Sequence, residues 1–156
     1  MGLDCIVQYY DENTKNYSEK LPHDIAEKLE PIKNYALVGF SITEYKNKNE
    51  NSCYYYISFR GKAYNEVVQK ITKQSLYNDL TPTKLQTMYL SLETMLENMT
   101  YIEEIQEIYN TVSMLELNDW LEMLSDMYIP SPDELIGLKE LFKICYKNNL
   151  RLYACY

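Results

Sequence analysis

The sequence predicts an α+β fold, in which a small and mainly antiparallel sheet packs against about four to five helices. Apolar and polar residues alternate near both ends of the chain, a pattern typical of strands. Two more strand-like segments flank a polar insert, and helical spacing dominates from residue 61 onward. None of the 156 residues forms a linker long enough to split the chain, so residues 1–156 are expected to form a single domain.

The strands are expected to form one sheet that contains both chain ends. In the first strand, Leu3, Cys5, Val7 and Tyr9 alternate with more polar positions, and a polar loop from Asp11 to Lys20 follows. The lysine- and asparagine-rich segment from Lys46 to Asn51 is typical of a hairpin loop, so the strands on either side of it should pair antiparallel. If its tyrosine-rich second strand lies outermost, it offers an edge for homotypic association. The four predicted strands are Leu3 to Tyr9, Ala36 to Thr43, Ser52 to Phe59 and Leu150 to Tyr156.

Helix starts and stops are marked by capping residues and prolines. Thr81 precedes Pro82 as an N-cap, and Ser131 with Glu134 forms a capping box around Pro132. Asn148-Asn149 is suited to the left-handed conformation that ends a helix. The predicted helices are Pro22 to Glu30 (ended by Pro31), Lys62 to Tyr77, a helix from Pro82 through Met99, Tyr101 to Leu117, a helical turn after Asn118, and Pro132 to Lys147.

One apolar stripe in the helix after Pro82 follows the i, i+3, i+4, i+7 spacing throughout. A methionine-rich stripe suits either an interaction groove or an ordinary core, and the core is the favoured interpretation because methionine fills irregular gaps. The stripe consists of Leu85, Met88, Tyr89, Leu92, Met95, Leu96 and Met99.

Composition excludes a membrane protein and predicts an intracellular one. Apolar runs are far shorter than the roughly 20 residues that cross a bilayer, and the N-terminus has no signal-peptide pattern. A reducing, cytoplasmic location is therefore expected, with free thiols at Cys5, Cys53, Cys145 and Cys155 rather than disulfides or a zinc site. The excess of lysine over arginine, with 17 tyrosines, indicates an AT-rich and perhaps viral genome.

The search for catalytic motifs is largely negative, so an enzyme is not the favoured class. Four glycines cannot build a nucleotide-binding loop, and no cofactor or metal is expected. The lone histidine, His23, is a weak candidate for a general base, and a dyad with Cys5 or Cys53 carries no supporting signature.

A small basic constellation lies where a predicted strand meets a predicted helix. Arg60 offers a planar guanidinium group and Lys62 a compact positive charge, and Gly61 lets a ligand approach the backbone closely. Tyr64 follows in the same segment. Helix N-termini favour anions, so these four residues are a candidate site for a phosphate or carboxylate ligand. The alternative is that Arg60 forms an internal ion pair, and it is the favoured interpretation.

Charge segregation is the strongest signal in the sequence. Residues 93–140 hold 12 acidic residues and one base, Lys139, and account for more than the whole net charge of −8. This charge disfavours direct binding of nucleic acid and favours a protein partner with a basic surface. The alternative is a solvated acidic face that serves only solubility, and for the charge taken by itself that is the favoured interpretation. The candidate partner-binding residues are Glu97, Glu103, Glu104 and Glu107.

Several short segments together resemble a known group. The start Met1-Gly2-Leu3-Asp4, the run from Phe59 to Tyr64, Ser75-Leu76-Tyr77 and the aromatic C-terminal strand resemble a group of small uncharacterised proteins of cyanobacteria, phages and large DNA viruses. The group has no assigned activity, so the resemblance implies no catalytic residue. The insert from Lys46 to Asn51 and the acidic helices depart from it.

Three functions follow from these observations. The first is a non-catalytic interaction protein, such as a viral or phage accessory factor, whose acidic face binds a basic partner or mimics nucleic acid. The second is an anion-binding module at Arg60 and Lys62, and the third an enzyme that uses His23 or Cys53. A homo-oligomer is compatible with each.

Overall fold

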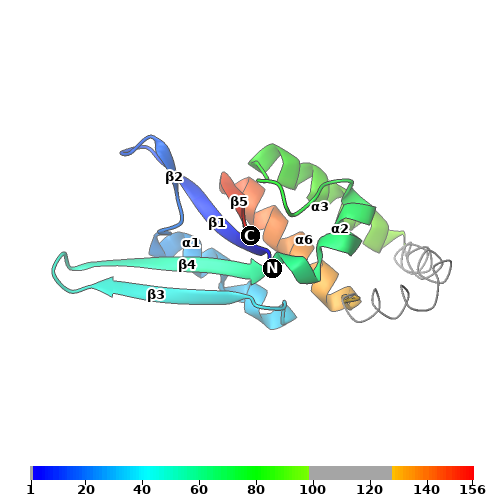
Figure 1. Ribbon diagram of the computed structural model, residues 1–156, viewed down its shortest axis with the longest axis horizontal. Coiled ribbons are helices and arrows are strands. Elements are labelled where there is room, and N and C mark those ends of the chain that lie inside the picture. Colours follow the sequence, from blue (N-terminus) through cyan, green and yellow to red (C-terminus); the bar gives the residue numbers. More distant parts are fainter. Residues whose placement is uncertain (1, 99–127) are drawn as a thin grey trace.

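The computed structural model describes residues 2–98 and 128–156 (Figure 1). Its sheet has five antiparallel strands in this part of the chain: β1 (Asp4–Asp11), β2 (Asn16–Ser18), β3 (Ser41–Asn47), β4 (Ser52–Arg60) and β5 (Leu150–Cys155). Strand β5 pairs with one edge of β1 from Asp4 to Tyr9. The opposite edge is shared, because β4 pairs with residues 4–6 and β2 with residues 9–11. Strand β3 pairs with β4 and lies outermost.

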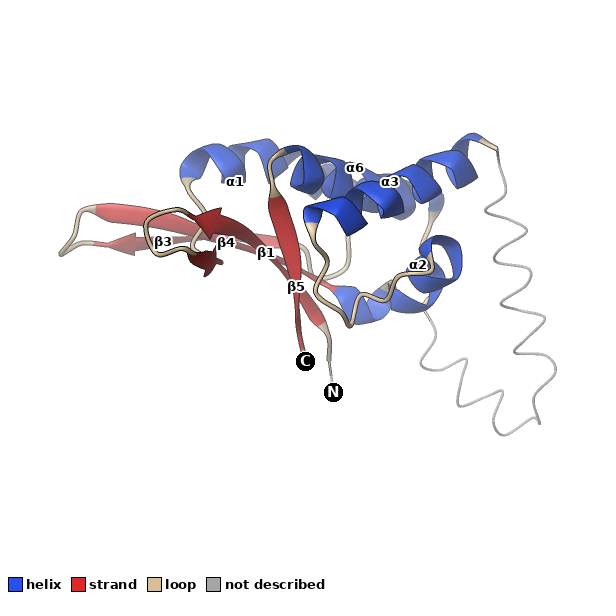
Figure 2. Ribbon diagram, turned by 90° about the horizontal axis from the view of Figure 1, so that it is seen from above, coloured by secondary structure: helices blue, strands red, loops and turns tan. Residues whose placement is uncertain are grey.

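Four α-helices and two short 3-10 helices complete the described fold. They are α1 (His23–Leu29), η1 (Glu30–Tyr35), η2 (Gly61–Ala63), α2 (Asn65–Thr72), α3 (Pro82–Glu97) and α6 (Pro132–Lys147). Helices α1 and α6 lie over one face of the sheet, and α3 runs beside α6 (Figure 2). The two chain ends lie next to each other, since Asp4 of β1 pairs with Cys155 of β5 (Figure 1).

The predicted α+β class is confirmed, as are its main local signals. Both chain ends join one sheet, and the strands around the polar insert pair antiparallel. The Thr81 side chain accepts a hydrogen bond from Lys84 N–H, and Ser131 and Glu134 form the complete capping box. Asn149 is left-handed, with φ 56°. The predicted helices from Tyr101 and from Asn118 fall outside the described residues.

Several boundaries were predicted wrongly: Lys46 and Asn47, expected in the hairpin loop, belong to β3, and the helix expected from Lys62 begins at Asn65, after η2. The strand expected from Ala36 begins only at Ser41, because the chain continues through Pro31 as η1 and Ala36 ends that turn with φ 53°. The helix expected to Tyr77 ends at Thr72, where Lys73 takes φ 63°. Part of the loop predicted after Asp11 forms the short strand β2.

The methionine-bearing stripe of α3 belongs to the core. Leu85, Met88 and Leu92 are fully buried, and Tyr89 and Met95 nearly so. They pack in one cluster with side chains from α6, α2 and the sheet. The core interpretation is therefore confirmed for these residues, whereas Met99 lies outside the described ranges.

The β3–β4 ribbon projects well beyond the helices (Figure 1). Side chains of β3 are exposed except Ile42, which is half-buried. The tyrosine-rich strand β4 lies between β1 and β3 in the sheet and is not outermost. It therefore does not offer the free edge through which two copies were expected to associate. The outer edge belongs to β3.

Candidate functional site

The predicted anion site lies at the corner where β4 turns into η2. Arg60 ends β4 directly opposite Asp4 of β1, and its Nη1 lies 3.2 Å from Asp4 Oδ1. Both side chains are partly exposed, and an ion pair of this kind contributes about 0–1 kcal/mol. The Arg60 backbone N–H donates to Val38 O. The expected internal ion pair of Arg60 is therefore present.

Glycines pack this corner tightly. A Cβ atom on Gly61 would lie 2.5 Å from Cys5 Sγ, so β1 approaches here more closely than any side chain allows. Gly39, with φ 70°, would place a Cβ 2.9 Å from Arg60 Cβ. The glycine at position 61 is thus explained by close packing, without a ligand.

The structure separates the four candidate ligand-binding residues. Arg60 is half-buried and Lys62 is exposed, whereas Gly61 and Tyr64 are buried. Lys62 donates its backbone N–H to Leu3 O, and within the described residues no contact of its side chain with Arg60 is found. An incoming anion would meet the Asp4 carboxylate beside Arg60, so anion binding at Arg60 and Lys62 stays a prediction with little geometric support.

Tyr64 instead enters a buried polar network that the sequence did not reveal. Its hydroxyl accepts the Val38 N–H at 2.7 Å and donates to Glu134 Oε2 at 2.5 Å. Glu134 Oε1 accepts from the Tyr128 hydroxyl at 2.7 Å and from the Ser131 N–H at 3.2 Å. Glu134 is only 8% exposed. Through Tyr64, the network joins Glu134 at the start of α6 to Val38 in the loop before β3.

Burial and hydrogen bonding oppose each other at Glu134. Desolvation works to raise its pKa, but hydrogen bonds from Tyr64, Tyr128 and Ser131 together prevail and lower the pKa below its ordinary value of 4.5. Burial and the bond to Glu134 raise the pKa of Tyr64. At neutral pH Glu134 is thus an anion that accepts hydrogen bonds, and Tyr64 is a neutral donor to it.

Of the candidate acidic residues, only Glu97 lies in the described ranges. It is exposed in the last turn of α3, where the helix dipole disfavours a carboxylate and no base is present. Asp133, in the first turn of α6, is exposed as well. Both helix ends point toward the same side of the molecule (Figures 1 and 2). Glu103, Glu104 and Glu107 fall outside the described residues.

Contacts of the reactive side chains give no support to a catalytic dyad. His23 Nδ1 lies 3.0 Å from the Tyr55 hydroxyl, and its Nε2 lies 4.0 Å from Glu27. Cys53 Sγ lies 3.3 Å from Glu44 Oε1, and desolvation together with this bond raises its pKa. Burial raises the pKa of Cys5 to about 12. All four cysteines are free, as predicted.

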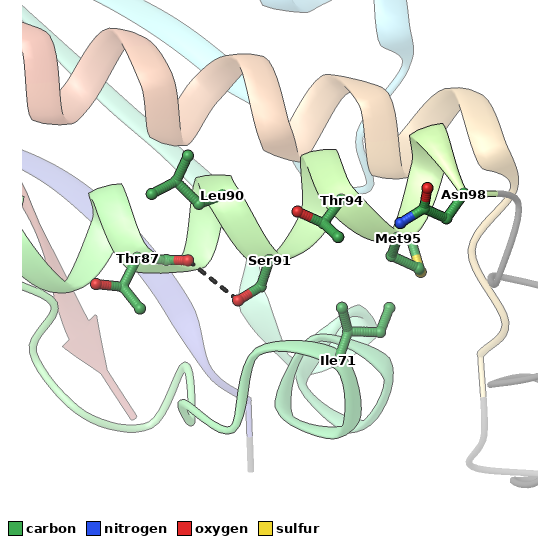
Figure 3. Close-up of a pocket in the computed structure, with 7 residues that line it drawn as sticks. All are labelled: Ile71, Thr87, Leu90, Ser91, Thr94, Met95 and Asn98. Atoms are coloured by element: carbon green, nitrogen blue, oxygen red, sulfur yellow. Dashed lines mark hydrogen bonds between the residues drawn. The ribbon is translucent and has the colours of Figure 1, made fainter.

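A shallow hollow of about 460 Å³ lies between α3 and α2 (Figure 3). Ile71 of α2 faces α3 across it, and the Ser91 hydroxyl donates to Thr87 O at 3.1 Å. No ionisable side chain lines it among the described residues, so these residues offer no acid or base beside the hydroxyls of Thr87, Ser91 and Thr94. Its lining residues are Ile71, Thr87, Leu90, Ser91, Thr94, Met95 and Asn98.

Neither metal clusters nor membrane spans occur in the described ranges. Residues 2–98 and 128–156 contain no group of three or more His, Cys, Asp or Glu side chains placed to hold a metal ion. No helix within the same ranges has the length and apolarity needed to cross a membrane. Comparisons with protein-family models, with curated proteins and with solved structures found no match. The resemblance to the group of small proteins stays a prediction.

Proposed function

We propose that this chain is a non-catalytic interaction protein that binds a basic protein partner through the acidic segment from Glu93 to Glu140. A viral or phage accessory factor is the setting that its composition favours. The observation that carries the proposal is charge: this segment holds 12 acidic residues against one base. Ordinary solubility does not require the negative charge to be gathered in one third of the chain.

Two described acidic residues of this segment, Glu97 and Asp133, support the proposal, whereas Glu93 accepts a hydrogen bond from Tyr89 and Glu140 lies 3.7 Å from Lys139 Nζ. Glu97 stays exposed at a helix end that disfavours negative charge, without a base in its turn. Asp133 adds a second exposed carboxylate at the start of the neighbouring helix α6. By contrast, Glu134 is taken up by internal hydrogen bonds and cannot contact a partner. We therefore leave Glu134 out of the binding face.

Charge reversal tests the proposal directly. The variant Glu97→Lys, Glu103→Lys, Glu104→Lys, Glu107→Lys is titrated against a lysine-rich peptide, with binding followed by fluorescence anisotropy at low and high salt. The wild type should bind with an affinity that falls as salt rises, because exposed charges are screened over about 10 Å at 0.1 M. The variant should lose most of this binding.

A matched control separates the acidic face from net charge. Replacing Glu12, Glu19, Glu27 and Glu66 with lysine changes the charge equally, and all four are exposed outside the acidic segment. This control should keep most of the affinity. Equal losses in both variants would reduce the effect to overall charge, and unchanged affinity in the first variant would refute the acidic face.

A further inference from the structure

The outer edge of β3 is open along the projecting ribbon. Only one side of β3 is paired, with β4 from Ser41 to Asn47, and no strand of the described residues lies beyond it. An open edge presents unpaired N–H and C=O groups that can pair with another strand. The ribbon extends away from the helices, so this edge is approachable by another molecule (Figure 1).

Charges on one face of β3 alternate in a self-complementary order. Glu44 and Lys46 are two residues apart and therefore share a face of the strand, with Lys46 Nζ 3.6 Å from Glu44 Oε1. The Lys46 side chain is 72% exposed and the Glu44 side chain 44%. Lysine alone on an edge strand discourages pairing, but glutamate at the second position provides its complement.

The other face of the ribbon carries a stacked pair of tyrosines. Tyr45 of β3 lies opposite Tyr54 of β4, with ring centroids 5.2 Å apart and planes inclined by 16°. Tyr45 is 46% exposed and lies on the outer strand. Lys20 Nζ lies over the Tyr54 ring at 5.3 Å.

We propose that two copies of this chain associate by antiparallel pairing of β3 with β3 of the second copy, about a two-fold axis at Tyr45. Tyr45 then faces Tyr45 of the partner subunit, and the four tyrosines form one row across the joined sheets. Glu44 faces Lys46 of the partner subunit, and symmetry repeats this ion pair. Cross-strand aromatic and opposite-charge pairs are the contacts that stabilise antiparallel strands.

Charge selects this register over its neighbours. A two-fold antiparallel pair always sets one residue against its own copy. An axis at Glu44 or at Lys46 would oppose like charges, and an axis at Thr43 would leave Glu44 opposite Ile42 of the partner subunit. Only the axis at Tyr45 pairs both charges with their opposites. The order of charges on β3 is thus complementary to β3 of a second copy of this chain.

Reciprocal charge reversal tests both the association and its register. Sedimentation velocity of the wild type should show a species of twice the 18.6 kDa chain mass that dissociates on dilution. Glu44→Lys and Lys46→Glu should each weaken association about tenfold or more, since two attractive pairs become repulsive. An equimolar mixture of the two variants should associate again, because each then meets opposite charges, as should the double variant with both changes.

Matched controls lie at the tip of the ribbon, outside the paired strand. Glu50→Lys and Lys48→Glu make the same charge changes and should leave association unchanged. Circular dichroism should show every variant folded, since all four side chains are exposed. A monomeric wild type at all concentrations would overturn the proposal. A dimer whose affinity is unchanged by charge reversal at Glu44 or Lys46 would overturn it as well. So would an equimolar mixture of the two variants that stays monomeric.

Discussion

Replacing Tyr64 with phenylalanine should destabilise the fold while keeping its ring packing. The hydroxyl bridges the Val38 N–H and the Glu134 carboxylate, at 2.7 and 2.5 Å. Without it, a partly buried donor and a buried carboxylate each lose one partner. Leaving such a group unsatisfied costs about 1–3 kcal/mol, so we expect a loss of about 2–4 kcal/mol in the free energy of unfolding.

Urea unfolding followed by circular dichroism measures this loss, and the melting temperature should fall by about 5–15 °C. Tyr128→Phe is the matched control, because Tyr128 donates to the other oxygen of Glu134 but is 42% exposed. Water can replace that hydroxyl, so about 0.5–1 kcal/mol is expected. If Tyr64→Phe costs no more than Tyr128→Phe, the buried hydrogen bonds of Tyr64 do not stabilise the fold.

The same network predicts a dependence of stability on pH. Because the native pKa of Glu134 is lowered, its contribution is fully present above the ordinary value of 4.5. It is lost as pH falls below that value toward the native pKa. The difference in unfolding free energy between wild type and Glu134→Gln should therefore be largest above pH 4.5 and shrink in acid, and a constant difference would contradict the ionised network.

Two further predictions concern the tight corner and the thiols. Gly61→Ala should destabilise by about 1–3 kcal/mol in urea unfolding, because its Cβ would meet Cys5 Sγ at 2.5 Å. Gly2→Ala should cost under about 0.5 kcal/mol, since it meets only the movable end of Arg60, and equal costs would contradict the packing argument. In a native thiol titration, exposed Cys53 and Cys155 should react quickly. Cys5 and Cys145, buried and with pKa values raised to about 12, should react only on unfolding, and four equal rates would refute their burial.

The sequence predicted elements whose signals are local and failed where contacts between distant residues decide. Thr81, Ser131 and Asn149 act within a few residues, and all three behave as expected. Ala36 to Phe40 has apolar spacing suited to a strand, yet Leu37 is buried against Gly137 of α6 and the strand starts later. Strand β2 depends on its pairing with β1, which composition does not reveal.

The candidate sites divide in the same way. The sequence alone indicates Arg60 and Lys62, because basic residues at the end of a predicted strand form a local pattern. The Asp4 partner lies 56 residues away and needed the sheet register to identify it. Glu134 was recognised only as half of a capping box, since nothing local indicates that its carboxylate also receives the hydroxyl of Tyr64.

The acidic interaction face can be tested most directly by mapping the contact surface in solution. Amide chemical shifts of the isotope-labelled chain are recorded by NMR during titration with a lysine-rich peptide at low salt. The proposal predicts that the shifted amides lie in the segment from Glu93 to Glu140, Glu97 and Asp133 among them, and that salt reverses the shifts. Shifts gathered instead around Lys62 or along β3, or no shifts at all, would contradict it.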